Sequence, residues 1–482
     1  MEVNELETIN RVLVIYTGGT IGMVHEEEGN PFSPLKPGNL EDLLSETGSF
    51  ASLGIELDSE VFDPPLDSSQ MTPSHWLRIA RVIRDRYNDF SGFVVLHGTD
   101  TMTYTTSALS FLLENLSKPV IVTGSQVPIA RMRSDARQNL VTAVQLASPD
   151  ACGVPCIPEV ALYFGGCLYR GNRVTKEDSK GFEAFVSQNL SPLAKVGESI
   201  EVATELVRDP SSEGFFIYES FEPHIIPLKV YPGMDAGLLK SIFAISDLKG
   251  VVLEVFGSGT APSSPSFLRE IHRAVERGIA VVAVSQCPRS GVEIGLYEAS
   301  SALLDQGVIS GLDLTPEAAL TKLGMLLGQG YSLETIAQLM QVNHRGEQSK
   351  SIYTVGYDNG EARQVFNGEA RQLTGRLDRH EILTAHVRIQ DIRLLEAESG
   401  EIDVQVFLNM PNVDDTTELK TAQHVKCAPH EWDGTPGLNI IADATATVRR
   451  VVDPLRPVRL SVRSTSGPVS FEKLVLSIVA KG

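Results

Sequence analysis

The sequence predicts an α/β protein that carries an additional all-β domain after its α/β part. Up to about residue 347, short apolar runs alternate with segments in which apolar residues have helical spacing, which favours a parallel sheet covered on both faces. Beyond about residue 348, short segments of alternating polarity are separated by Gly, Pro, Asn and Asp, a pattern typical of a β-sandwich. A chain of 482 residues is long enough for two or three such domains.

Composition narrows the functional class. The formal net charge is −20, and an acidic body disfavours binding to nucleic acid. Five scattered cysteines suit reduced thiols in the cytosol. The first ten residues lack the pattern of a leader peptide, and no apolar run reaches membrane length. We therefore expect a cytoplasmic protein with neither a membrane nor a nucleic-acid partner.

The first strand carries the first candidate site residue. The apolar run Val12–Tyr16 predicts a buried strand, and it ends in Thr17, which two glycines follow. Ligands of open α/β sheets bind beyond the carboxyl ends of the strands, so Thr17 is a candidate functional residue. A plain tight turn explains the same residues equally well. A nucleotide-binding loop fits poorly, since neither the Gly-x-Gly-x-x-Gly nor the Gly-Lys-Ser/Thr pattern follows.

Two loops after this strand are further candidates. Residues His25–Pro31 are polar and punctuated by Gly and Pro, so they form either a lid beside the first strand or a solvated turn. Thr72 and Pro73 predict the start of a helix. Ser68 and Ser69 precede this start, where small hydroxyls and free N–H groups suit a carboxylate. A simple capping loop is the alternative.

A second strand repeats the design of the first. The buried run Gly92–Leu96 ends in a His-Gly pair followed by Thr99 and Asp100, and helical spacing continues over residues 103–116. Asp100 could serve only to cap that helix. Two strand ends that both carry Thr, however, are what a site built from neighbouring strand ends needs.

Lys176 is the candidate base. Two further strands, at residues 120–123 and 160–164, precede it. It is either a surface lysine, as most lysines are, or it faces inward beside Thr99 and Asp100. In the second case loss of water would lower its pKa and allow it to accept a proton.

Residues 192–214 are polar and acidic without clear periodicity, so we expect a linker there, followed by a second α/β unit. The unit has no nucleophile of its own, so we expect its strand-end loops to complete a neighbouring pocket. Strands are expected at residues 226–231, 250–255 and 279–285, and helices at 266–277 and 332–343.

The C-terminal segments show no helix pattern of useful length and no catalytic constellation, so we expect a role in binding or assembly. Their strands are expected at residues 384–394, 402–408, 458–462 and 474–479. His424, Cys427 and His430 have the spacing of a partial metal site. Because no fourth ligand lies nearby, we expect a hydrogen-bonded loop cluster there and no metal.

Four motifs together closely resemble the bacterial type I, cytoplasmic L-asparaginases, with a similarity that runs from about residue 11 to residue 346. They are Tyr16–Met23, His97–Met102, Val120–Pro128 and Arg170–Lys176. The resemblance implies a Rossmann-like N-terminal α/β domain at residues 10–200 and a smaller α/β domain at 215–347. The all-β domain at 365–482 is an addition to the usual enzyme of this family.

The resemblance also implies a reaction, the hydrolysis of L-asparagine to L-aspartate and ammonia. By this likeness Thr17 is the nucleophile that attacks the side-chain amide carbon. Thr99, Asp100 and Lys176 match the family's second catalytic cluster, in which Lys activates Thr and Asp holds the α-ammonium of the substrate. The family works without a metal or organic cofactor, as a homodimer or homotetramer.

The same resemblance assigns substrate contacts and shows a departure. Ser68 and Ser69 match the residues that contact the α-carboxylate and the rest of the amino acid. Family members often carry a lid tyrosine, but this chain has His25, Glu26 and Asn30 there, with Phe32 as the nearby aromatic residue. Tyr297, in the second unit, is the candidate replacement.

A second departure concerns regulation. Some type I enzymes have an allosteric asparagine site lined by a Thr, an Arg and a Cys. Thr175 and Cys287 match this set, but Glu254 stands where the Arg is expected. We therefore do not expect the same regulation.

Two other functions remain open. The asparaginase-like subunit of the archaeal glutamyl-tRNA amidotransferase makes ammonia by the same chemistry, but its extra domain precedes the core, whereas here it follows. A non-catalytic asparagine sensor or scaffold would need no nucleophile, yet Thr17 and the cluster of Thr99, Asp100 and Lys176 are present. The sequence does not decide between asparagine and glutamine as substrate.

Overall fold

The computed structural model divides the chain into two compact units. The first is Met1–Ile336 with His344–Glu347, and the second is Ala337–Asn343 with Gln348–Gly482. The structure describes residues 10–26, 35–37, 50–292, 298–363, 365–373, 377, 379–397, 399–409, 424–434, 438–451 and 457–481.

The first unit is built around an eight-stranded sheet. Its strand order is β13-β12-β9-β8-β7-β5-β1-β4. The strands from β4 to β8 are parallel to their neighbours, whereas β9, β12 and β13 add an antiparallel edge. The bounds are β1 Arg11–Gly18, β4 Glu56–Leu66, β5 Gly92–Leu96, β7 Val120–Thr123, β8 Val160–Phe164, β9 Cys167–Arg170, β12 Ala194–Val196 and β13 Ile200–Val202.

Strand β1 lies between β4 and β5 and is buried from Val12 to Gly18. Both faces of the strand are covered, as expected for a continuous apolar run in a parallel sheet. Residue Tyr16 pairs with Leu96 of β5 in parallel register. The two predicted strand ends therefore lie side by side at the same edge of the sheet.

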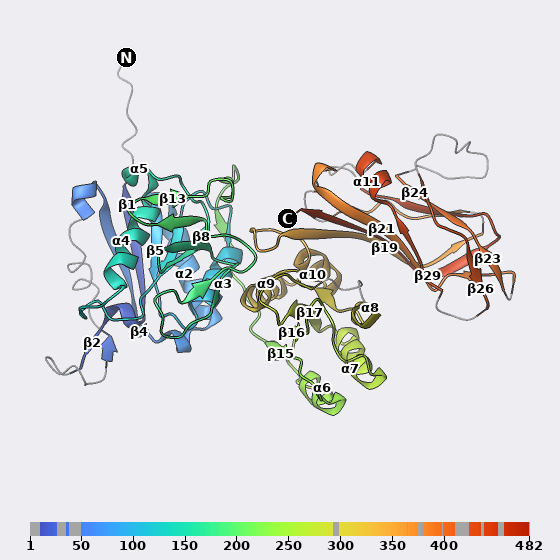
Figure 1. The fold of residues 1–482 in the computed structure, drawn as a ribbon, viewed down its shortest axis with the longest axis horizontal. Coiled ribbons are helices and arrows are strands. Elements are labelled where there is room, and N and C mark those ends of the chain that lie inside the picture. The colour runs from blue at the N-terminus through green and yellow to red at the C-terminus, as the bar shows by residue number, and fades with distance from the viewer. Residues whose placement is uncertain are drawn as a thin grey trace, which may run out of the picture. The chain divides into compact units, whose positions relative to one another are not determined.

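In the described part of this unit, several helices accompany the sheet (Figure 1). They are α2 Pro73–Asp85, α3 Met102–Leu112, α4 Ala136–Ala147 and α5 Pro149–Cys152. Helix α2 begins as predicted, with Thr72 as N-cap and Pro73 in the first turn. The helix predicted at residues 103–116 ends earlier, at Leu112. There the chain turns into the short strand β6 (Leu113–Glu114), which pairs with β14 (Phe216–Ile217).

A second, four-stranded parallel sheet completes the first unit, in the order β15-β16-β17-β18. Its strands are β15 Ile225–Lys229, β16 Gly250–Val255, β17 Ala280–Ser285 and β18 Ile309–Ser310. The accompanying helices are α6 Ala236–Phe243, α7 Pro265–Glu276, α8 Glu298–Asp305 and α9 Pro316–Gly328, while α10 Leu333–Met340 belongs to this unit only as far as Ile336. Helix α9 packs against α3, which joins the two sheets' layers within this unit.

Short antiparallel pairs complete the loops of this unit. Strand β2 (Met23–His25) pairs with β3 (Leu35–Pro37). Strand β10 (Thr175–Lys176) pairs with β11 (Phe185–Val186). The second pair fixes the backbone that carries Lys176.

The second unit consists mainly of antiparallel strands, as predicted. Two sheets share one apolar core, to which Val355 and Leu476 contribute from one sheet and Val406 and Val462 from the other. The first sheet contains β19 Lys350–Ala362, β29 Val469–Lys481, β21 Ile382–Gln390, β27 Ile440–Asp443 and β22 Arg393–Leu394. The second contains β20 Val365–Asn367, β28 Leu460–Ser464, β24 Val404–Leu408 and β25 His424–Lys426, while β23 Gly400–Ile402 pairs with β26 His430–Trp432.

A short helix also occurs in this unit beside the predicted strands. Helix α11 spans Thr445–Val451. It is only about two turns long, too short to produce a clear helical period in the sequence. Its buried residue Val448 belongs to the core of the unit.

None of the helices in the described part of the chain is long and apolar enough to cross a membrane.

Candidate active site

Thr17 lies at the carboxyl end of β1, at the edge of the sheet where the candidate site residues gather. Its side chain is buried, and its hydroxyl donates a hydrogen bond of 2.8 Å to the backbone carbonyl of Leu96 on β5. Gly19 follows with φ at +92°, and a Cβ there would lie 2.5 Å from the backbone nitrogen of Gly98. Only glycine therefore allows the loop after β1 to approach the loop after β5 so closely.

Lys176 faces Thr99 and Asp100. Its Nζ lies 2.9 Å from Thr99 Oγ1 and 2.7 Å from Asp100 Oδ1. The lysine side chain is 15 % exposed, whereas that of Asp100 is 70 % exposed. The ammonium thus sits between a nearly buried hydroxyl and a carboxylate that is open to solvent. Of the two alternatives for Lys176, the structure has the inward-facing one.

Ser68 and Ser69 bring a third strand end to the same place. They lie in a 3₁₀ turn, Ser68–Gln70, directly after β4. Asp67 accepts a hydrogen bond from the backbone N–H of Ser69 at 2.8 Å, which caps this turn. Ser68 is buried, and its backbone carbonyl accepts the hydroxyl of Thr101 at 2.7 Å. The neighbouring strands β4, β1 and β5 thus each contribute polar side chains to one edge.

Three polar side chains that the sequence analysis did not select support these residues. Gln126 lies 3.5 Å from the Thr99 hydroxyl and donates to the carbonyl of Gly181 at 2.9 Å. His97, directly after β5, is completely buried and hydrogen-bonded on both ring nitrogens. The third is Glu317, a buried residue of helix α9.

Glu317 reaches the site from helix α9. It accepts a hydrogen bond of 2.6 Å from the hydroxyl of Thr175, the residue before Lys176. Burial raises the pKa of Glu317, although the bond from Thr175 opposes the rise, and the nearby Glu254 carboxylate adds to it. A carboxylate therefore lies beside Thr175, and Glu254, at the position where an arginine was expected, is near enough to affect it. Cys287 is exposed.

Some predicted residues fall outside the described part of the chain. Tyr297 does, and so does the predicted lid from residue 27 onward. The structure describes only the backbone of His25, in β2. In the C-terminal unit, the His424 side chain also falls outside, whereas Cys427 is buried.

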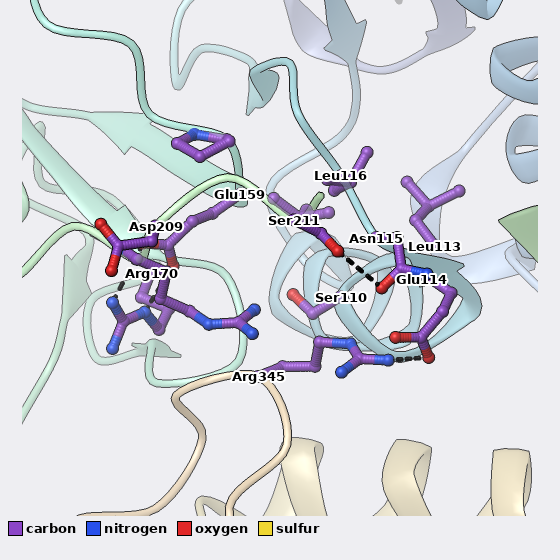
Figure 2. Close-up of a pocket in the computed structure, with 13 residues that line it drawn as sticks. Ser110, Leu113, Glu114, Asn115, Leu116, Glu159, Arg170, Asp209, Ser211 and Arg345 are labelled. Atoms are coloured by element: carbon purple, nitrogen blue, oxygen red, sulfur yellow. Dashed lines mark hydrogen bonds and ion pairs between the residues drawn. The ribbon is translucent and has the colours of Figure 1, made fainter. Parts of the chain in front are cut away.

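Figure 2 shows a separate cavity of about 220 Å³ near the C-terminal end of α3. None of the predicted site residues lines it. Its charged side chains largely pair with one another, since Arg170 bonds Glu159 at 2.5 Å and Arg345 bonds Glu114. Arg208, which also lines it, donates to the backbone carbonyl of His344 at 3.1 Å. The two serine hydroxyls of its lining are also paired, since Ser110 donates to the carbonyl of Thr106 and Ser211 to the side chain of Asn115.

Among the described residues, no group of three or more His, Cys, Asp or Glu side chains is placed to hold a metal ion. The edge formed by β4, β1 and β5 offers a small set of reactive side chains. The set consists of two threonine hydroxyls, one ammonium and one exposed carboxylate. This set suits nucleophilic attack on an acyl group, with an ionic contact left for a charged substrate.

Comparison with known proteins identifies the family. Residues 11–208 match the model of the asparaginase N-terminal domain, and residues 224–340 match that of the glutaminase/asparaginase C-terminal domain. The chain is 44 % identical over 338 residues to L-asparaginase 1 of Escherichia coli K12, covering 70 % of this chain and 97 % of that one. It is 42 % identical over 362 residues to the human 60 kDa lysophospholipase, covering 70 % of this chain and 61 % of that one.

A solved structure agrees with these matches. The crystal structure of L-asparaginase I from Vibrio cholerae superimposes with a TM-score of 0.65 at 41 % identity, covering 71 % of this chain and 99 % of that chain. The two family models together span most of the first unit and end at residue 340, before the β-rich part that begins with β19. The chain therefore belongs to the asparaginase family.

Proposed function

We propose that this protein is an L-asparaginase, which hydrolyses L-asparagine to L-aspartate and ammonia with Thr17 as the nucleophile. The observation that carries the proposal is the contact of Lys176 with both Thr99 and Asp100, at the strand end beside the one that carries Thr17. An amidohydrolase needs a positioned hydroxyl, a base and a fixed substrate. Membership of the asparaginase family and the identity to L-asparaginase 1 support the substrate.

In the first half of the reaction, the Thr17 oxygen bonds to the side-chain carbon of asparagine, and the carbonyl oxygen takes the negative charge. The bond from the Thr17 hydroxyl to Leu96 fixes the hydroxyl before substrate binds. The C–N bond then breaks, and the amide leaves as ammonia with the proton that Thr17 has lost. The product of this half is an aspartyl ester on Thr17.

Water completes the reaction. The Thr99 hydroxyl takes a proton from the attacking water and passes its own proton to the Lys176 nitrogen, while that water bonds to the ester carbon. The ester bond breaks, the Thr17 oxygen regains a proton, and L-aspartate is released. The hydrogen bond of 2.9 Å between the Lys176 nitrogen and the Thr99 hydroxyl places this nitrogen where it can receive the Thr99 proton.

The charged end of the amino acid fixes the substrate. Asp100 holds the α-ammonium with the part of its carboxylate that faces solvent, since its side chain is 70 % exposed while one oxygen contacts Lys176. Ser68 and Ser69 bind the α-carboxylate through hydroxyl and backbone N–H groups. Two such contacts of opposite charge place the amide at Thr17 and disfavour substrates that lack an α-amino acid group.

The remaining parts of the proposal concern organisation. The α/β enzyme has two domains, at residues 10–200 and 215–347, and the all-β domain at 365–482 is an accessory. The enzyme is a cytoplasmic homodimer or homotetramer that requires no metal or organic cofactor. Sedimentation velocity on the purified chain measures the oligomeric state. The activity assay, run with and without a chelator, tests whether a metal is required.

The test of the function is ammonia release from L-asparagine and L-glutamine, each over a wide concentration range. We expect turnover of asparagine, with glutamine hydrolysed more slowly, and its loss in Thr17→Ala. Calorimetry measures the binding of L-asparagine to wild type and to Thr17→Ala under the same conditions. Turnover of neither amide by wild-type protein, together with measurable binding, would replace the enzyme by an asparagine sensor.

A further inference from the structure

His97 is the centre of a buried chain of hydrogen bonds beside Thr99. One ring nitrogen, Nδ1, lies 2.7 Å from the backbone carbonyl oxygen of Gly98. The other, Nε2, lies 2.9 Å from the hydroxyl of Thr105 on α3. That hydroxyl also accepts a bond of 2.9 Å from the indole N–H of Trp76 on α2. The side chain of His97 is completely buried.

The donors and acceptors in this series of hydrogen bonds fix the tautomer of His97. A carbonyl oxygen only accepts, so Nδ1 must carry the proton that it shares with Gly98. An indole N–H only donates, so the Thr105 oxygen accepts from Trp76 and gives its own proton to Nε2. Burial lowers the pKa of His97 to about 4, so the ring is neutral near pH 7. The network therefore runs in one direction, from Trp76 through Thr105 and His97 to the Gly98 carbonyl.

The bond to Gly98 controls the direction of the next amide. In a planar trans peptide the C=O of Gly98 and the N–H of Thr99 point in opposite directions. Because the carbonyl faces the buried imidazole, the N–H of Thr99 points away from the interior. Among the described residues this N–H has no hydrogen-bond partner. Buried or half-buried donors of this kind are normally paired, so the amide is left for a group that arrives with substrate.

The residues packed around Gly98 restrict the Gly98–Thr99 peptide, whose carbonyl is hydrogen-bonded to His97. A Cβ on Gly98 would lie 2.6 Å from Ser68 Oγ, so the residue is packed against the loop after β4. A Cβ on Gly19 would lie 2.5 Å from the Gly98 nitrogen, so the loop after β1 also packs against this residue. The Gly98 carbonyl accepts a hydrogen bond from the ring of His97.

We propose that His97 is a positioning residue, which holds the Gly98–Thr99 peptide so that the Thr99 N–H points at the oxyanion formed on the substrate. The inference rests on the proposed asparaginase reaction and adds to it the group that orients the oxyanion donor. His97 does not touch the substrate and transfers no proton. Its contribution appears only when charge develops on the carbonyl oxygen, because that is when an aligned N–H binds more strongly.

Three substitutions of His97 separate this role from simple packing. His97→Asn places an amide N–H near the position of Nδ1 and so retains the bond to Gly98. His97→Gln places its amide near Nε2 and keeps only the Thr105 side. His97→Leu fills the space without a hydrogen bond. Each variant is assayed for kcat and KM with L-asparagine, and the folded fraction is measured by circular dichroism and thermal unfolding.

We expect kcat to fall by about 10- to 100-fold in His97→Leu and His97→Gln, since loss of a complete oxyanion donor costs about 10²- to 10³-fold. We expect KM to change by less than about 3-fold, because the bond acts in the transition state. His97→Asn should recover most of the lost kcat. Equal losses of kcat per folded site in all three variants, or no loss in His97→Leu, would overturn the proposal.

A measurement on the unaltered full-length chain covers the case in which the variants fail to fold. Two-bond ¹H–¹⁵N spectra of protein labelled at histidine distinguish the two neutral tautomers, and His97→Asn identifies the signal. We expect the Nδ1–H tautomer at neutral pH, and the Nε2–H tautomer or an imidazolium would contradict it. If wild-type protein hydrolyses no asparagine, the proposed function fails, while the tautomer still decides whether His97 holds the Gly98 carbonyl.

Discussion

Lys322 and Glu347 form an ion pair of 2.7 Å in which both side chains are completely buried. Lys322 lies on helix α9, and Glu347 ends the segment His344–Glu347 that belongs to the first unit. The backbone N–H groups of His344 and Arg345 also donate to the Glu347 carboxylate, at 3.1 Å and 2.6 Å. A carboxylate that is satisfied in this way fixes the segment to the α/β core.

The same segment is connected to the loop that carries Lys176. Arg170, Asn172 and Arg173 donate hydrogen bonds to the carbonyls of three successive residues, Gly346, Arg345 and Glu347, at 3.4, 3.1 and 2.7 Å. Arg173 lies three residues before Lys176. The buried pair of Lys322 and Glu347 therefore helps to fix the backbone of the loop that carries Lys176.

Removal of one partner of the buried pair should be strongly destabilising. We expect Glu347→Gln to lower the free energy of unfolding of the first unit by about 3–5 kcal/mol, because it leaves the Lys322 ammonium buried without its counter-charge. The double variant Lys322→Met, Glu347→Leu should regain most of this loss. Urea unfolding followed by circular dichroism measures both. A single variant as stable as wild type would contradict the role of the pair.

The pair also predicts how stability depends on pH. Burial alone would raise the pKa of Glu347, but the charges of Lys322 and His344 and the N–H of Arg345 lower it well below its ordinary value of 4.5. A carboxyl whose pKa is lower in the folded state binds protons more readily when unfolded, so stability falls as pH falls below that ordinary value. We expect the unfolding free energy to drop more steeply between about pH 5 and pH 3 in wild type than in the double variant. Equal slopes would show that other carboxyls dominate.

The position of Glu347 decides where the chain can be shortened. A chain that ends at residue 349 keeps the carboxylate, whereas one that ends at residue 346 removes it and leaves Lys322 buried alone. We expect the longer version to retain turnover per folded site and the shorter to unfold at a lower urea concentration. Active-site titration and urea unfolding of both chains provide the comparison. Equal stability of the two would show that the carboxylate is dispensable.

Glu317 should act on the reaction through Thr175. Its carboxylate accepts the Thr175 hydroxyl at 2.6 Å, next to Lys176 in β10. Glu317→Gln keeps an acceptor at this place, whereas Glu317→Leu removes it, so we expect kcat to fall about 10-fold in the Leu variant and by much less in the Gln variant. Steady-state rates with L-asparagine test this. A larger loss in the Gln variant would instead indicate that the negative charge matters.

The sequence was sufficient to predict the strand ends that carry Thr17 and Thr99 and to predict the family. Thr17 and Thr99 follow continuous apolar runs, and a continuous run predicts a buried parallel strand whose end lies at the site edge. The contact between Lys176 and Asp100 joins residues 76 positions apart. No local pattern specifies such a contact, so only the resemblance predicted it.

Other features had no local signal. Lys322 and Glu347 are charged residues, which are almost always at the surface, so a sequence gives no reason to bury them. His97 looks like an ordinary core histidine until the Gly98 carbonyl and Thr105 are placed around it. The short pair β6 and β14 and the helix α11 are shorter than the window over which hydrophobic periodicity can be read.

The most direct test of the central claim is the initial rate of ammonia release from L-asparagine by wild type, Thr17→Ala, Lys176→Met and the control Lys180→Met. Lys180 is an exposed lysine of the same loop, so its loss removes a charge without touching Thr99. We predict that Thr17→Ala and Lys176→Met each lose at least about 10³-fold in kcat while remaining folded, and that Lys180→Met keeps the wild-type rate. Substantial turnover by folded Thr17→Ala or Lys176→Met would contradict the assignment of nucleophile and base.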